Sequence, residues 1–174
     1  MKKIITLLSI IILTGCGALD ISNTPTKKVE AYLDSYQKLD DNIMNDLDSL
    51  VDDTEYTVEQ KARYKEIFKK HYSNLKYEIK DEKINGDKAT VEVSIEVSDY
   101  SKILSEDVNK DEFKDENGVY SPSKYFDYQL DRIEKATEKV KYNIIFKLTK
   151  RNNEWIIDDL DEESKKKIHG IYLY

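Results

Sequence analysis

Two stretches of alternating apolar and polar residues constrain the fold of this 174-residue chain more than any other feature. In residues 89–97, Ala, Val, Val, Ile and Val occupy the odd positions, with charged or hydroxyl residues between them. Residues 140–148 carry Val, Tyr, Ile, Phe and Leu at the even positions. Because a period of two places successive side chains on opposite faces, each stretch predicts a β-strand with one buried face.

The strand at 89–97 is preceded by a hairpin partner that starts at Leu75 and continues through Tyr77 and Ile79. The two segments are joined at Asn85-Gly86-Asp87, a sequence typical of tight turns. Both apolar sets fall on odd numbers, so a plain two-residue turn would pair apolar with polar residues. We therefore expect either a three-residue loop with Gly86 in the left-handed conformation or a β-bulge nearby.

A second hairpin is predicted after residue 148. The turn at Arg151-Asn152-Asn153 leads into Glu154-Trp155-Ile156-Ile157. An even-length loop there pairs Leu148 with Ile157 on the inner face and Lys147 with Asp158 on the outer face, which agrees with both patterns.

Apolar residues at helical spacing predict two helices before the first hairpin. Thr24-Pro25 has the pattern of a helix start, and the apolar positions continue to Val51, which predicts one long amphipathic helix bent near residues 40–42. Thr57 and Gln60 form a capping-box pattern that opens a second helix ending at about Tyr72.

The remaining segments predict an insertion and two further helices. Residues 98–120 are rich in Asp, Glu and Lys and indicate an irregular acidic insertion with a short helical turn after Tyr100. Ser121-Pro122-Ser123 starts a third helix to about Thr137, and Glu162 to Ile168 form a last helix ending at Gly170. The order of elements predicts a single α+β domain, residues 24–174, in which N-terminal helices pack on the apolar face of a curved antiparallel sheet of about four strands.

This pattern resembles the nuclear transport factor 2-like superfamily of cystatin-like α+β cones. The resemblance rests on Thr24-Pro25 followed by Val29-Glu30-Ala31-Tyr32-Leu33, on the strand at 89–97 and on the ending Glu154 to Leu160. It implies a cone of sheet closed by helices, and enzymes of that superfamily place acidic, His or Tyr residues inside the cone. The side chains expected to point inward here include no carboxylate or imidazole. Those that could line a pocket are Tyr77, Tyr142 and Trp155.

The N-terminal residues have the layout of a secretory signal. Lys2 and Lys3 precede an apolar run of about ten residues, too short for a membrane span of about 20. The run ends in Leu13-Thr14-Gly15-Cys16, which resembles the bacterial lipobox, and Cys16 is the only cysteine. The resemblance implies cleavage after residue 15, a diacylglyceryl group on Cys16 and a short tether over residues 16–23.

A lipoprotein signal predicts attachment to the cell membrane through the acyl chains of Cys16, with the domain on the extracytoplasmic side. Lysine far outnumbers arginine, and Ile, Asn, Asp and Tyr are abundant, which favours an AT-rich genome and, with the lipobox, a Gram-positive bacterium. A net charge of −7 argues against nucleic acid as a partner.

Candidates for metal binding are weak in this sequence. His71 and His169 are the only imidazoles, and we expect both at the polar rims of helices. Asp107, Asn109 and Asp111 begin like a calcium loop, but Glu112 stands where the turn glycine is needed and Gly118 where a bidentate Glu is needed. We predict no metal, no cofactor and no catalytic residue.

The sequence therefore favours a non-catalytic binding or scaffolding domain. Its predicted partner is an envelope protein or cell-wall component, because several tyrosines in loops or at helix ends should be exposed, and tyrosine is an efficient contact residue. The tyrosines in such positions, of which some are expected to be exposed, are Tyr56, Tyr100, Tyr120, Tyr125, Tyr128, Tyr172 and Tyr174. The alternatives are a binder of small apolar ligands that uses the cone pocket, and an enzyme. The oligomeric state stays open.

Overall fold

The structure is a computed structural model that describes residues 23–52 and 54–173. The predicted signal, its lipobox and Cys16 lie outside the described residues. The helices are α1 (Pro25–Lys38), α2 (Asp41–Asp52), α3 (Val58–Ser73), α4 (Ser101–Leu104), the 3-10 helix η1 (Lys110–Phe113), α5 (Pro122–Glu134) and α6 (Glu162–Ile168). The strands are β1 (Lys76–Asn85), β2 (Lys88–Ser98), β3 (Lys139–Arg151) and β4 (Glu154–Ile157).

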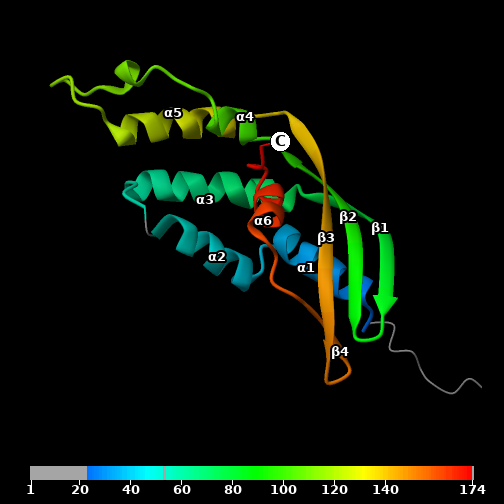
Figure 1. The fold of residues 1–174 in the computed structure, drawn as a ribbon. Coiled ribbons are helices and arrows are strands. Elements are labelled where there is room, and N and C mark those ends of the chain that lie inside the picture. Colours follow the sequence, from blue (N-terminus) through cyan, green and yellow to red (C-terminus); the bar gives the residue numbers. More distant parts are fainter. Residues whose placement is uncertain (1–22, 53, 174) are drawn as a thin grey trace, which may run out of the picture.

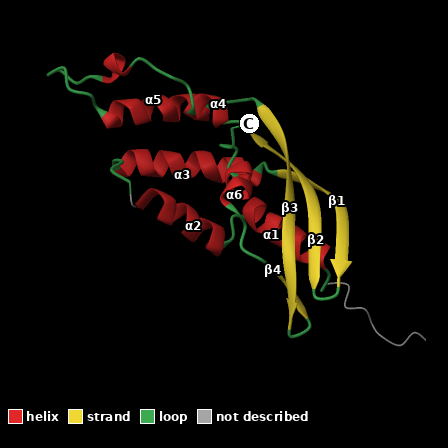
Figure 2. Cartoon of the chain, viewed as in Figure 1, coloured by secondary structure: helices red, strands yellow, loops and turns green. Residues whose placement is uncertain are grey.

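The fold is α+β, as predicted. The four strands form one antiparallel sheet in the order β1-β2-β3-β4. The helices lie on one side of this curved, unclosed sheet, with α1 against the strands and α3 and α5 further along (Figure 1). Figure 2 shows the same two layers coloured by secondary structure. The alternating pattern of β2 is reproduced in its burial, since Val91, Val93 and Ile95 have no exposed surface.

In the first hairpin, a β-bulge brings the apolar residues of the two strands opposite one another. Asn85 pairs with Lys88 across a two-residue turn in which Gly86 has φ 60°, and the register shifts between Ile79 and Asp81. Beyond the shift, Ile79 pairs with Val93, so apolar residues face one another again. Of the two predicted solutions, the structure contains the bulge.

The second hairpin has the predicted register. Leu148 pairs with Ile157, and the backbone N–H of Asp158 donates to the carbonyl of Lys147 at 2.8 Å. Asn152 and Asn153 form the turn with φ values of 50° and 65°, a conformation that asparagine tolerates better than most residues. The described chain is fastened to this turn at its start, because the Asn23 side-chain amide donates to the Asn153 carbonyl at 2.8 Å and its oxygen accepts from Trp155 N–H at 3.2 Å.

The prediction of one long N-terminal helix is wrong. Leu39 is left-handed, with φ 56° and ψ 47°, and caps α1, and α2 begins two residues later. Val29 and Leu33 of α1 and Leu47 of α2 are all fully buried in the same core. The apolar spacing continues across the break because both helices pack into one core. This spacing alone does not indicate a change of chain direction.

The acidic insertion packs on the body through two buried aromatic side chains, Tyr100 against α3 and Phe113 against α5. Tyr100 is buried, and its N–H donates to the carbonyl of Gly170 at 2.8 Å just before α4. Phe113 is buried, and Tyr120 forms an isolated bridge with Lys114. The candidate calcium loop is a turn closed on itself, because Asp115 accepts from the backbone N–H groups of residues 117 and 119.

Candidate functional site

The three residues predicted to line a cone pocket do not meet in one cavity. The Tyr77 hydroxyl donates to Asp34 Oδ1 at 2.7 Å, and Tyr77 is half-buried because β1 is an edge strand. The Tyr142 hydroxyl donates to the carbonyl of Tyr172 at 2.9 Å, and Tyr142 is almost fully buried. Trp155 is buried beside the ammonium group of Lys150. Each of the three side chains thus has a structural partner within the domain.

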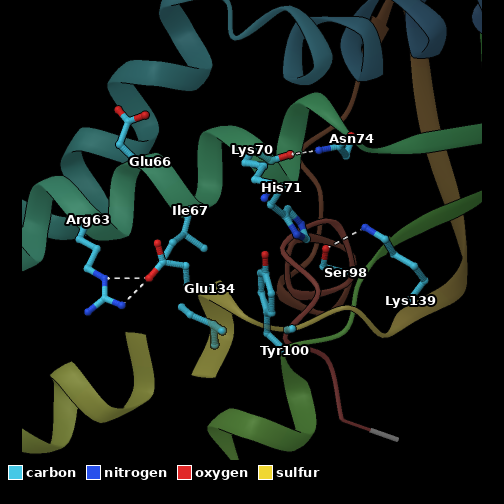
Figure 3. Close-up of a pocket in the computed structure, with 12 residues that line it drawn as sticks. Arg63, Glu66, Ile67, Lys70, His71, Asn74, Ser98, Tyr100, Glu134 and Lys139 are labelled. Carbon is cyan, nitrogen blue, oxygen red and sulfur yellow. Dashed lines mark hydrogen bonds and ion pairs between the residues drawn. The ribbon is translucent and has the colours of Figure 1, made fainter. Parts of the chain in front are cut away.

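Several cavities instead lie in the helical layer, and the one between α3 and α5 is called the α3–α5 cavity here. It has a volume of about 400 Å³, within the range of small-molecule sites. Figure 3 shows Arg63 and Glu134 at one end, Ser98 and Lys139 at the other, and His71 with Tyr100 between them. The lining residues are Arg63, Glu66, Ile67, Lys70, His71, Asn74, Ser98, Tyr100, Ile133, Glu134, Ala136 and Lys139.

Regular structure places these side chains. The α3 residues follow helical spacing, with Arg63, Ile67, Lys70 and Asn74 separated by three or four positions and therefore on one face. On the sheet side, Ser98 and Lys139 are register partners at the end of the β2–β3 ladder. The cavity is therefore bounded by one face of α3, the end of α5 and the end of the β2–β3 ladder.

The charges of the α3–α5 cavity are unevenly paired. The Arg63 guanidinium binds Glu134 and, at 2.6 Å, Asp131. Lys139 Nζ donates to the hydroxyl of Ser98 at 3.0 Å. Within the described part of the chain, neither Lys70 nor Lys139 forms an ion pair with a carboxylate. Two ammonium groups at this cavity thus keep their charge available.

His71 contradicts the prediction of a polar-rim position, since only 2% of it is exposed. Its Nε2 lies 2.9 Å from the Ile168 carbonyl, which can only accept, so Nε2 carries the proton. Burial lowers the His71 pKa to about 4, which leaves the ring neutral at pH 7. Nδ1 is therefore an acceptor, and it has no hydrogen-bond partner among the residues described.

The second cavity, called the tyrosine cavity here, lies on the other side of α3. Its volume is about 410 Å³. Tyr72, the residue after His71, contributes to its wall, so consecutive residues of α3 line the two cavities. The lining residues are Tyr32, Tyr36, Ile43, Asp46, Ser49, Leu50, Tyr72, Lys165 and His169.

Hydrogen bonds fix the aromatic wall of the tyrosine cavity. The hydroxyls of Tyr32 and Tyr36 are 3.3 Å apart, and the rings meet edge to face. The Tyr72 hydroxyl lies 2.7 Å from His169 Nδ1. Burial raises the pKa of Tyr36 and Tyr72 and lowers that of His169 to about 4. All four groups are neutral at pH 7.

In the described ranges 23–52 and 54–173, no cluster of His, Cys, Asp and Glu side chains is arranged to hold a metal ion. The same ranges contain no helix with the length and apolar character needed to cross a bilayer. Of the tyrosines among which some were expected to be exposed, Tyr120 is exposed, Tyr56, Tyr125, Tyr128 and Tyr172 are half-buried, and Tyr100 is buried. Tyr174 lies outside the described residues.

Comparisons with protein-family models, with curated proteins and with solved structures gave no match to this chain.

Proposed function

We propose that the protein is a membrane-anchored extracytoplasmic lipoprotein whose domain is a non-catalytic binding module, and that the α3–α5 cavity takes a small organic anion. The observation that carries the proposal is the pair of unpaired ammonium groups, Lys70 and Lys139, at one cavity. The lipid anchor at Cys16 is supported by the lipobox resemblance of residues 13–16.

The charge balance of the cavity favours an anion. Three cationic side chains and two carboxylates line it, so it carries one net positive charge inside a chain of net charge −7. Arg63 is held by its own carboxylate partners. Lys70 and Lys139 can therefore donate to a ligand carboxylate or phosphate without losing an existing ion pair, and such charge-assisted bonds are the stronger kind.

The cavity wall between Lys70 and Lys139 adds a further requirement on the chemistry of the ligand. His71 Nδ1 offers a lone pair that no described residue satisfies, and a buried unsatisfied acceptor costs about 1–3 kcal/mol. A ligand that brings a hydroxyl proton to this nitrogen recovers that energy. Ile67, Ile133 and Ala136 supply apolar contact. The favoured ligand is thus a small organic anion that also carries a hydroxyl group.

Isothermal titration tests this proposal on the whole chain, purified from membranes in a zwitterionic detergent. The probes are glycerol 3-phosphate and lactate as hydroxylated anions, propyl phosphate as the matched anion without hydroxyls, and glycerol as the uncharged control. We expect the hydroxylated anions to bind best, propyl phosphate to bind about fivefold more weakly than glycerol 3-phosphate, and glycerol not to bind.

Matched lysine variants locate the site. Lys139→Gln should weaken binding by about tenfold or more, since a hydrogen bond to a charged group contributes about 1.5–3 kcal/mol. Lys83→Gln, on the distant β1 edge, should leave the affinity unchanged. Equal effects of the two substitutions, or no binding of any anion, would overturn the assignment of this cavity.

A further inference from the structure

We propose that the tyrosine cavity is a second binding site, and that its ligand is a neutral sugar unit. This inference does not depend on the anion site, because it uses a separate cavity on the other side of α3. It rests on three properties of the wall, namely its balanced charge, its free hydrogen-bonding capacity and its mixture of rings and aliphatic side chains.

The charges around the tyrosine cavity cancel. Asp46 supplies one negative charge and Lys165 one positive charge, and the phenols and the imidazole of His169 are neutral. Lys165 is paired with Glu162 at 2.9 Å. Asp46 would repel an anion and Lys165 would repel a cation, whereas an uncharged ligand meets neither repulsion.

Hydrogen-bonding groups of both kinds remain available. In the Tyr32–Tyr36 pair one hydroxyl donates to the other, and the proton of the accepting hydroxyl stays free for a ligand. Asp46, on the exposed side of α2, has no hydrogen bond or ion pair with any residue in the described ranges. The hydroxyl of Ser49 donates to the backbone carbonyl of Asn45, and its oxygen can still accept a hydrogen bond from a ligand. The cavity can therefore both donate to and accept from a ligand.

A sugar ring matches this wall better than an apolar ligand. Its C–H faces can pack on the tyrosine rings and on Ile43 and Leu50, of which Leu50 is 52% exposed. Its hydroxyls can bond to Asp46 and to the tyrosine pair. An apolar ligand would cover those polar groups without bonding to them, at a cost of about 1–3 kcal/mol for each.

The test uses the whole chain with ¹³C-labelled tyrosine, in a zwitterionic detergent without a sugar headgroup. The probes are the neutral disaccharides diacetylchitobiose, cellobiose and maltose, with glucosamine as the cationic control and glucuronate as the anionic control. We expect at least one neutral disaccharide to produce saturable shifts of the Tyr32 and Tyr36 ring resonances, and the two charged sugars to bind at least fivefold more weakly.

Two variants assign the effect to this cavity. Asp46→Asn is at the surface, where it should not disturb folding, and we expect it to weaken sugar binding about fivefold or more. Tyr32→Phe removes one hydroxyl of the pair, whereas Tyr77→Phe removes a hydroxyl outside the cavity and should change nothing. The proposal fails if no neutral disaccharide shifts these resonances at millimolar concentration, if a charged sugar binds equally well, or if Asp46→Asn has no effect.

Discussion

The hydroxyl of Tyr72 lies 2.7 Å from Nδ1 of His169. One residue earlier in both segments, Nε2 of His71 lies 2.9 Å from the carbonyl of Ile168. Two consecutive residues of α3 thus hold two consecutive residues at the end of α6, 97 positions further along the chain. The C-terminal helix is fixed at the wall that separates the two cavities.

Tyr72→Phe should lower the free energy of unfolding by about 1–2 kcal/mol, because it removes a hydrogen bond in a place that is only 1% exposed and leaves His169 without that partner. Urea unfolding followed by circular dichroism measures the change. Tyr77→Phe is the matched control, since Tyr77 and its partner Asp34 are both only half-buried, and we expect a loss under about 0.5 kcal/mol. A larger loss in the control than in Tyr72→Phe would contradict the structural role of the Tyr72–His169 bond.

Stability should fall as the pH drops from about 6.5 to about 4. Burial lowers the pKa of both His71 and His169 from 6.5 to about 4, so in this window the unfolded chain binds protons that the folded chain does not. The contribution of each neutral histidine to the free energy of unfolding is complete above pH 6.5. It is lost as the pH falls through the folded-state pKa, by up to about 3 kcal/mol for each histidine.

Urea unfolding at a series of pH values checks this expectation. His169→Gln should reduce the pH slope of stability between pH 4.5 and 6.5 by about half, whichever way it changes stability at pH 7. An unchanged slope in this variant would show that His169 is not buried in its neutral form.

Gly170→Ala should be strongly destabilising. Gly170 has φ +70°, and a Cβ there would lie 2.1 Å from the carbonyl oxygen of Ser98, a backbone atom. Gly118 has a similar φ of +78° with open space around it, so Gly118→Ala reports the backbone strain alone, about 1 kcal/mol. We expect Gly170→Ala to cost at least about 2 kcal/mol more in thermal or urea unfolding. Similar losses in the two variants would contradict the close approach of residues 98 and 170.

Gln60→Ala should destabilise the packing of α3 against α5. The buried Gln60 side chain donates to Asp127 Oδ1 at 2.8 Å and to the hydroxyl of Ser123 at 2.8 Å, and it accepts from Thr57 N–H at 3.0 Å. We expect a loss of about 2–3 kcal/mol in urea unfolding. Gln129→Ala, which removes one bond to Tyr125 within α5, should cost under about 1 kcal/mol.

Cys16→Ser tests the lipid anchor independently of either cavity. We expect the variant to leave the membrane fraction and to lack the mass of a diacylglyceryl group, as judged by fractionation of the bacterial host and mass spectrometry of the N-terminal peptide. The control is the unsubstituted chain, which should stay with the membrane. Membrane retention of Cys16→Ser would contradict the lipobox interpretation.

The sheet could be predicted from sequence in detail. Alternation over two long strands, together with Gly86 and the Asn152-Asn153 turn, restricts each hairpin to very few registers, and the structure contains one of them. The sequence predicted a bend near residues 40–42 but not the full break at Leu39, because a leucine in the left-handed conformation carries no sequence signal. The alternation of apolar and polar residues constrains a whole strand, whereas the break between α1 and α2 depends on the conformation of one residue.

The two cavities could not be predicted from sequence, because segments far apart in the chain form their walls. His71 follows the buried residues Ile67 and Phe68 by four and three positions, which places it on the packed face of α3, but its hydrogen-bond partner comes from Ile168 of α6, 97 positions later. Tyr32 and Tyr36 are four positions apart, which predicts a common face, but only α2 and α6 turn that face into a cavity wall. The signal that existed was this clustering of polar aromatic residues on one face of α1. The same spacing also fits a face buried in the core, and no pattern within a single helix distinguishes a core face from a cavity wall.

If Cys16 carries the proposed lipid anchor, the attachment of Asn23 to the β3–β4 turn would orient the domain relative to the bilayer. Seven residues separate Cys16 from Asn23 and can span at most about 25 Å, so a chain anchored at Cys16 keeps that turn close to the lipid headgroups. Lys139, at the opposite end of β3, is about 40 Å away along the strand, at about 3.3 Å for each residue. The sheet would then serve as a spacer that lifts the anion cavity clear of the headgroup layer, to a height where ligands arriving from the cell wall can reach it.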